Sequence, residues 1–309
     1  MSYSALANAT RTLTETTAQA AWRQWSAVFS LATADRSARA LVDPEALLLV
    51  SMALAEDHPR VWSAGPVWAV RGSRLLSVQR TKNLAESFPP TIAPRLNEFA
   101  SLAMNRGNDK RWRSLVTEPL ADRPKSRKES FAPRVSSPPA LMLRLRLGLG
   151  VGIKADVLAY LIGLAGAAST VQEIANATAY FGRAVRRSVE ELAAAGFVES
   201  RASAPISYRA NIEEWAQLLD FDANDPPVWR AWALVYAFVA AVLHWVPTMS
   251  SKSEPVVASR ARDLWNHHRP ALDVCGVRDV PSSRYPGSEF LQPFIGALEQ
   301  TAERIEDLV

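Results

Sequence analysis

The sequence predicts a mainly α-helical protein with one small β-hairpin near the middle, flanked by N- and C-terminal helical domains. Apolar residues recur at helical spacing through much of the 309 residues, and the first 105 show no sustained strand alternation. Two short strand-like runs at 197–201 and 206–210 predict the hairpin. Five prolines among serine and basic residues at 118–139 indicate a break between domains.

These features predict four parts. The first is an N-terminal helical domain over 1–105, and the second is a basic, proline-rich linker over 106–140. A central unit over 141–212 follows, and then a C-terminal helical region over 213–309 that would serve dimerisation or sensing.

The expected helices differ in how clearly their ends are marked. Asp43 and Pro44 make a strong helix start, with Asp as N-cap and Pro in the first helical position. The run Leu141–Val151 alternates Leu and Arg, which predicts a short strand or an extended arm. The other expected helices are Gln19–Leu31, His58–Val70, Leu75–Leu84, Ile92–Met104, Asp225–Val246, Val256–His268 and Glu289–Leu308.

Composition favours a cytoplasmic protein. The chain is 48% hydrophobic and 21% charged, which is ordinary for a globular protein. Its single cysteine, Cys275, allows no intrachain disulfide, and Met1–Ala20 lacks the apolar segment of a secretory signal. The longest apolar run, Ala231–Leu243, is too short to span a bilayer and suits a core or dimer-interface helix.

Positive charge gathers in the linker. Nine Lys and Arg against four Asp and Glu give residues 106–134 a net charge of +5, more than the +4 of the whole chain. Such an excess attracts phosphate, although a solvated linker explains it equally well. The candidate phosphate contacts are Lys110, Arg111, Arg113, Lys125, Arg127 and Lys128.

The central unit carries the most informative pattern. Lys154–Gly166 predicts a buried helix, and Ser169 or Thr170 would cap a short helix over Val171–Thr178. Thr170 with Glu173 has capping-box spacing. A turn over Ala179–Gly182 leads to a third helix, Arg183–Ala195, which Gly196 ends. Helix, short helix, turn, helix and hairpin together predict a winged helix-turn-helix.

The third helix divides into two faces at about 100° per residue. Val185, Val189 and Leu192 fall on one side and are expected to pack on the first two helices. The opposite side carries Arg183, Arg186, Arg187 and Glu190 and would be free to enter a DNA major groove. A solvated surface is the alternative, in which Arg186 pairs with Glu190 at i,i+4.

Residues 170–200 resemble the DNA-reading part of bacterial winged-helix regulators of the MarR or ArsR type. The resemblance implies that the helix before the glycine reads double-stranded DNA and that the hairpin touches the flanking backbone. It covers about a fifth of the chain, and those families usually consist of much shorter proteins. The matching residues are Thr170, Glu173, Ile174, Ala175, Val185, Leu192, Gly196 and Val198. The candidate DNA-binding residues are Thr170, Tyr180, Phe181, Arg183, Arg186, Arg187, Arg201 and Arg209.

Other constellations give no site. His267, His268 and Cys275 are too few and poorly spaced for zinc, so no metal is expected, and Gly148–Gly152 lacks the ending of a phosphate loop. The ten tryptophans suit core packing or subunit contact better than an effector pocket or base stacking. No catalytic set and no cofactor motif is found, so an enzyme is not expected.

The sequence therefore predicts a DNA-binding transcription regulator. It would be a homodimer, with repression favoured over activation and with an unidentified small-molecule or protein effector. The alternative is a protein–protein adaptor or regulatory partner of a neighbouring enzyme, which would use the winged helix for docking. An enzyme acting on nucleic acid is the weakest of the three hypotheses.

Overall fold

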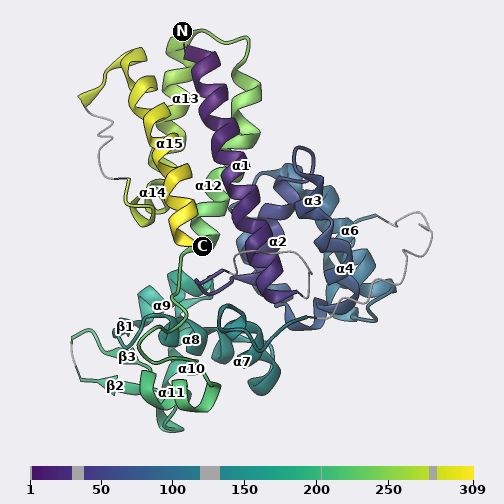
Figure 1. The fold of residues 1–309 in the computed structure, drawn as a ribbon, viewed down its shortest axis with the longest axis vertical. Coiled ribbons are helices and arrows are strands. Elements are labelled where there is room, and N and C mark those ends of the chain that lie inside the picture. The colour runs from purple at the N-terminus through teal and green to yellow at the C-terminus, as the bar shows by residue number, and fades with distance from the viewer. Residues whose placement is uncertain (1, 30–37, 119–132, 203, 278–283) are drawn as a thin grey trace.

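The computed structural model describes residues 2–29, 38–118, 133–202, 204–277 and 284–309 (Figure 1). Helices account for most of these residues, and three short strands form one small antiparallel sheet. The predicted mainly helical class is therefore confirmed. Within the described residues the apolar side chains form three cores.

The first helix is much longer than the sequence predicted. Helix α1 runs over Ser2–Val28, whereas the apolar pattern indicated a start only at Gln19. Residues 10–17 of this helix are rich in threonine, and three of these threonines are buried. Each donates its hydroxyl hydrogen to the carbonyl four residues earlier, as in Thr14 Oγ1 to Thr10 O at 2.7 Å. These bonds satisfy the buried hydroxyls, so a polar segment can pack as a core helix.

The two ends of the chain share one core. Leu6 and Leu13 of α1 pack in a cluster with residues of the C-terminal helices, among them Phe238 and Phe294. Figure 1 shows α1 and α15 side by side. The first helix thus contributes to the C-terminal bundle as well as to the N-terminal core. The bundle helices are α12 (Trp232–Trp245), α13 (Glu254–His267), α14 (Arg269–Val274) and α15 (Leu291–Leu308), with 3₁₀ turns at Val246–Met249 and Gly287–Phe290.

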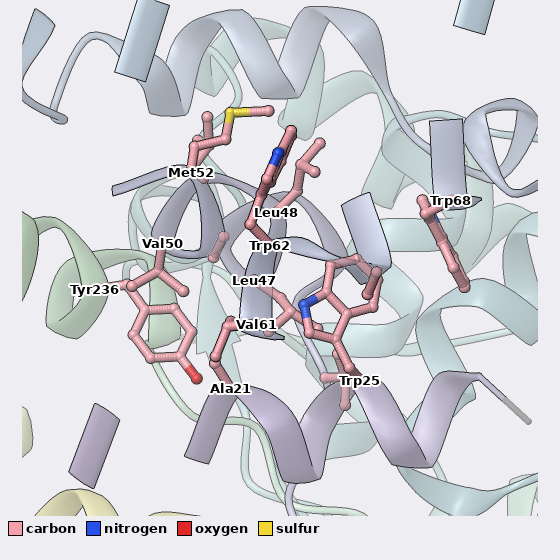
Figure 2. Close-up of a cluster of buried hydrophobic side chains, with 14 of the residues drawn as sticks. Ala21, Trp25, Leu47, Leu48, Val50, Met52, Val61, Trp62, Trp68 and Tyr236 are labelled. Atoms are coloured by element: carbon pink, nitrogen blue, oxygen red, sulfur yellow. The ribbon is translucent and has the colours of Figure 1, made fainter. Parts of the chain in front are cut away.

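Tryptophans fill the N-terminal core, which confirms the core-packing interpretation for them. Figure 2 shows Trp25, Trp62 and Trp68 around the buried helix α2. The rings of Trp25 and Trp68 lie 5.4 Å apart, and Trp25 Nε1 donates to Ser51 Oγ at 2.9 Å. The helices of this region are α2 (Pro44–Ala53), α3 (Pro59–Trp62), α4 (Ala64–Arg71), α5 (Val78–Ala85) and α6 (Ala93–Asn105), with 3₁₀ turns at Ser73–Leu75, Pro90–Ile92 and Lys110–Leu115.

One prediction about the middle of the chain is wrong. Leu141–Val151 is neither strand nor arm, because α7 spans Leu141–Leu149 after a 3₁₀ turn at Pro138–Ala140. Leu141, Leu143 and Leu145 are all buried, and α7 ends at Gly150 with φ 87°. At the start of the basic segment, the 3₁₀ turn Lys110–Leu115 packs on α6 through the fully buried Trp112.

The central unit combines helices and the sheet. Helix α8 (Ile153–Gly163) is followed by strand β1 (Ser169–Thr170), α9 (Val171–Thr178) and α10 (Gly182–Ala194). Strands β2 (Glu199–Arg201) and β3 (Ser207–Arg209) complete the sheet in the order β1-β3-β2, with Tyr208 opposite both Ser169 and Ser200. Helix α11 (Ile212–Leu219) follows. The two-residue β1 is too short to show alternation, so the sequence predicted only the hairpin.

The apolar helix near residue 230 is shorter than predicted. Helix α12 begins at Trp232 and not at Asp225, because residues 226–231 form no helix and Trp229 N donates to Gly163 O at 2.8 Å. Within the described residues, Trp232–Met249 is the one helical segment long and apolar enough to cross a membrane. More than half of this segment, 56%, is buried inside the protein, as in a core helix.

Candidate nucleic-acid interface

Helix α10 presents a basic face to solvent. Val185 and Val189 are fully buried against α8 and α9, and Leu192 is nearly so. Arg183, Arg186, Arg187 and Glu190 are all exposed on the opposite side. The predicted division of this helix into an apolar and a charged face is confirmed.

The arginines on this face differ in their partners. Arg187 Nε donates to Glu191 Oε1 at 2.9 Å, so the i,i+4 pair involves Arg187 and not Arg186 with Glu190. Lys154, at the start of α8, reaches the other oxygen of the same carboxylate at 2.8 Å. Within the described residues, Arg183 and Arg186 make no ion pair.

Thr170 works as the sequence predicted, as the N-cap of α9. Its Oγ1 accepts a hydrogen bond from Glu173 N at 3.3 Å, and Glu173 Oε2 accepts one from Thr170 N at 2.7 Å. The bond from the Thr170 amide, together with that from its hydroxyl, lowers the pKa of Glu173. This capping box fixes the start of α9 beside β1.

Tyr180 and Phe181 lie in opposite environments. The hydroxyl of Tyr180 donates to Asp156 Oδ2 at 2.7 Å and contacts Ser77 Oγ at 3.2 Å, so its polar end points into the protein. Burial, with the charge of Asp156, raises the pKa of Tyr180. Phe181 keeps 77% of its surface exposed at the entry to α10. The hydroxyl of Tyr180 is thus engaged inside the protein, while the side chain is half-buried, and its contact with DNA stays a prediction.

The hairpin arginines lie at the edge of the unit. Arg209 Nε on β3 donates to Glu199 Oε2 on β2 at 2.7 Å, a cross-strand pair that stabilises the hairpin. Arg201 is exposed at the end of β2. Both arginines are accessible, and Arg209 would have to share its guanidinium with Glu199.

The upstream basic segment is only partly described. Lys110, Arg111 and Arg113 are exposed on the 3₁₀ turn beside α6, which Figure 1 shows apart from α10. Arg111 has a structural task, because Nη2 donates to Asp109 Oδ2 at 2.7 Å and to Ser73 O at 3.1 Å. Lys125, Arg127 and Lys128 lie outside the described residues.

A buried charge network lies behind α10. Arg80 Nη1 donates to Asp43 Oδ1 at 2.6 Å and to Glu45 Oε2 at 2.7 Å. Arg146 continues the chain, with Nη1 at 2.6 Å from Glu45 Oε1 and Nε at 2.7 Å from Asp156 Oδ1. The network joins α2, α5, α7 and α8, and each side chain is buried. It comprises Asp43, Glu45, Arg80, Arg146 and Asp156.

Glu45 and Arg80 stay charged in this network. Burial alone would raise the pKa of Glu45, but the adjacent Arg146 and Arg80 outweigh burial and lower it. Burial opposes the charge of Arg80 as well, yet Asp43 and then Glu45 raise the pKa of this guanidinium. Removing one partner would leave an uncompensated buried charge, which is far more costly than losing an exposed pair.

Helix α5 connects this network to the turn before α10. Arg80 Nε donates to Thr178 O and Asn83 Nδ2 to Ala179 O, each at 2.9 Å. Ala179 has φ 57°, a left-handed conformation that an alanine adopts at a cost. Together with the bond from Tyr180 to Ser77, these contacts hold the turn between α9 and α10 on one face of α5.

The sequence contains one indication of this network that periodicity and motifs did not reveal. Glu45, Arg146 and Asp156 each stand in a helix that is otherwise mostly apolar. A charged residue on the buried side of a helix needs an opposite charge beside it. Each of these three residues therefore predicts a buried partner of opposite charge. Their partners are distant in sequence, and spacing alone does not identify them.

The described residues offer no metal centre, since no group of three or more His, Cys, Asp or Glu among them is arranged to hold an ion. The candidate interface is the exposed arginine face of α10 together with the arginines of the adjoining hairpin. No protein-family model, no curated protein and no solved structure matches this chain, so its function is inferred from its own residues.

Proposed function

We propose that α8, α9, α10 and the sheet form a winged helix-turn-helix that binds double-stranded DNA. One observation carries the proposal: α10 buries its valines and leucine and leaves Arg183 and Arg186 exposed without an ion pair among the described residues. Arginine pairs with guanine edges and with phosphates, and a helix of this size fits the major groove. The exposed hairpin would contact the flanking backbone.

The anchoring of α10 supports the proposal. Side chains that read bases need a fixed geometry, and rigid elements provide it better than loops. The contacts of Arg80, Asn83 and Tyr180 fix the turn from which α10 starts. The arginine face is therefore presented by a rigid support.

The biological role proposed is transcriptional regulation in the cytoplasm, with repression favoured. A homodimer would place two α10 helices about 34 Å apart on a near-palindromic site. The flanking helices would form the dimer contact or receive an effector.

Fluorescence anisotropy with duplex from the gene's own upstream region, and with unrelated duplex, tests the proposal. Arg183→Ala with Arg186→Ala should weaken specific binding about 100-fold, since each base contact contributes about 1–3 kcal/mol. Arg260→Ala on α13 is the control, because it removes an exposed arginine far along the chain. Unchanged binding in the double variant would exclude α10 as the recognition helix.

A protein–protein adaptor is the second candidate, and exposed apolar side chains favour it. Phe181 is 77% exposed, and Leu218 on α11 is 68% exposed. Docking on a protein would bury such side chains, whereas DNA phosphates would not. Affinity for duplex that falls steeply with salt supports DNA binding; no salt-dependent affinity for any duplex supports the adaptor.

A further inference from the structure

We propose that Glu191 restrains Arg187 and Lys154, and thereby limits the sequence-independent part of DNA binding. This inference rests on the proposed function and concerns the same surface. Glu191 would thereby increase the specificity of DNA binding. Arg183 and Arg186 remain available to contact base edges.

The geometry of one carboxylate carries the inference. Glu191 Oε1 accepts from Arg187 at 2.9 Å, and Oε2 lies 2.8 Å from Lys154 Nζ. The two cations come from different helices, α10 and α8, and both oxygens are occupied. The two hydrogen bonds, first from Lys154 and then from Arg187, lower the pKa of Glu191, so the carboxylate stays charged.

The exposure of the three groups makes the restraint reversible. The side chains of Arg187, Lys154 and Glu191 are 82%, 53% and 41% exposed. Exposed ion pairs are weak, so a well-placed phosphate or base can displace Glu191. Glu191 thus competes with DNA phosphates for Arg187 and Lys154, and this competition lowers the affinity for unrelated duplex. In a specific complex, the additional base contacts outweigh the competition.

Electrostatics gives the expected direction. Affinity for unrelated duplex depends on the number of phosphates that the protein neutralises, and each one steepens the salt dependence by about 0.9. When Glu191 is removed, Arg187 and Lys154 are free to contact as many as two further phosphates. Removing Glu191 also removes a negative charge that repels the phosphates.

Glu191→Gln and Glu190→Gln form a matched pair of variants. Both substitutions remove one exposed negative charge from α10, but among the described residues Glu190 makes no ion pair. Anisotropy with unrelated duplex, between about 50 and 200 mM salt, would compare them with the wild type. Circular dichroism would verify that each variant is folded.

We expect E191Q to bind unrelated duplex about three- to tenfold more tightly and with a salt slope steeper by about 1–2. E190Q should give a smaller gain with an unchanged slope. The gain from E191Q should vanish when Lys154→Gln and Arg187→Gln are also present, because the restrained cations are then gone.

Other outcomes would contradict the Glu191 inference, and one of them would also contradict the proposed function. Equal effects of E191Q and E190Q, or a gain that persists without Lys154 and Arg187, would show that only net charge matters. A wild type that binds DNA with an unchanged E191Q would reject the Glu191 inference and leave the proposed function standing. No binding by any variant would reject both.

Discussion

The hydroxyl of Tyr180 donates a hydrogen bond to the carboxylate of Asp156 across 2.7 Å. Tyr180 belongs to the turn between α9 and α10, and Asp156 lies on the buried side of α8. Asp156 also accepts from Arg146, so the contact extends the buried charge network to the base of the arginine face. The position of α10 thus depends on residues of the N-terminal core.

Tyr180→Phe should loosen the start of α10. A hydrogen bond to a charged group contributes about 1.5–3 kcal/mol, so the free energy of unfolding should fall by about 2 kcal/mol. Hydrogen exchange of the first α10 amides should accelerate. Tyr160→Phe is the control, because it loses only a neutral contact with Ser169 Oγ at 3.2 Å. Equal effects on α10 exchange would contradict the anchoring role of Tyr180.

Arg146→Met should destabilise the whole protein. It would leave Glu45 and Asp156 buried without their shared partner, which costs about 3–5 kcal/mol. Urea unfolding would measure the loss. The exposed Arg74→Met should change stability by no more than about 0.5 kcal/mol. A change below about 1 kcal/mol for Arg146→Met would mean that the network relaxes or admits water.

Thr170→Ala should weaken α9 by removing the capping box. Loss of a Thr N-cap costs about 1 kcal/mol, and Thr170→Ser should retain most of the stability because serine caps equally well. Chemical unfolding of the three proteins would test this expectation. The same midpoint for the Ala and Ser variants would show that the cap is dispensable.

His268 should make the C-terminal bundle sensitive to acid. Burial, and then the neighbouring His267, lowers the pKa of His268 from 6.5 to about 4, and its ring packs 5.7 Å from Phe238. The unfolded chain binds a proton below pH 6.5 that the folded protein takes up only near pH 4. This contribution to stability is therefore complete above pH 6.5 and is lost as the pH falls toward 4.

Urea unfolding at pH 7 and pH 5 would measure this loss. The wild type should lose about 2 kcal/mol from His268 between these values. His268→Gln should lose correspondingly less, and His244→Gln on α12 serves as the control. A His268→Gln variant with the same pH dependence as the wild type would exclude His268 as the cause.

Local features of the sequence determined the helical class and several elements of the central unit. The bounds of α9, the capping box of Thr170 and the two faces of α10 all depend on residues within a few turns of each other. Periodicity and capping are properties of contiguous sequence, so the arginine face could be identified without the fold.

The tertiary structure alone decided how these elements are supported. Arg80 pairs with a residue 37 positions away, and Arg146 with one 101 positions away. In the folded protein α7 is a packed helix where alternation suggested a strand, and the hydroxyl of Tyr180 points inward to Asp156. Such pairings depend on which surfaces exclude water together, and that is settled only when distant segments meet.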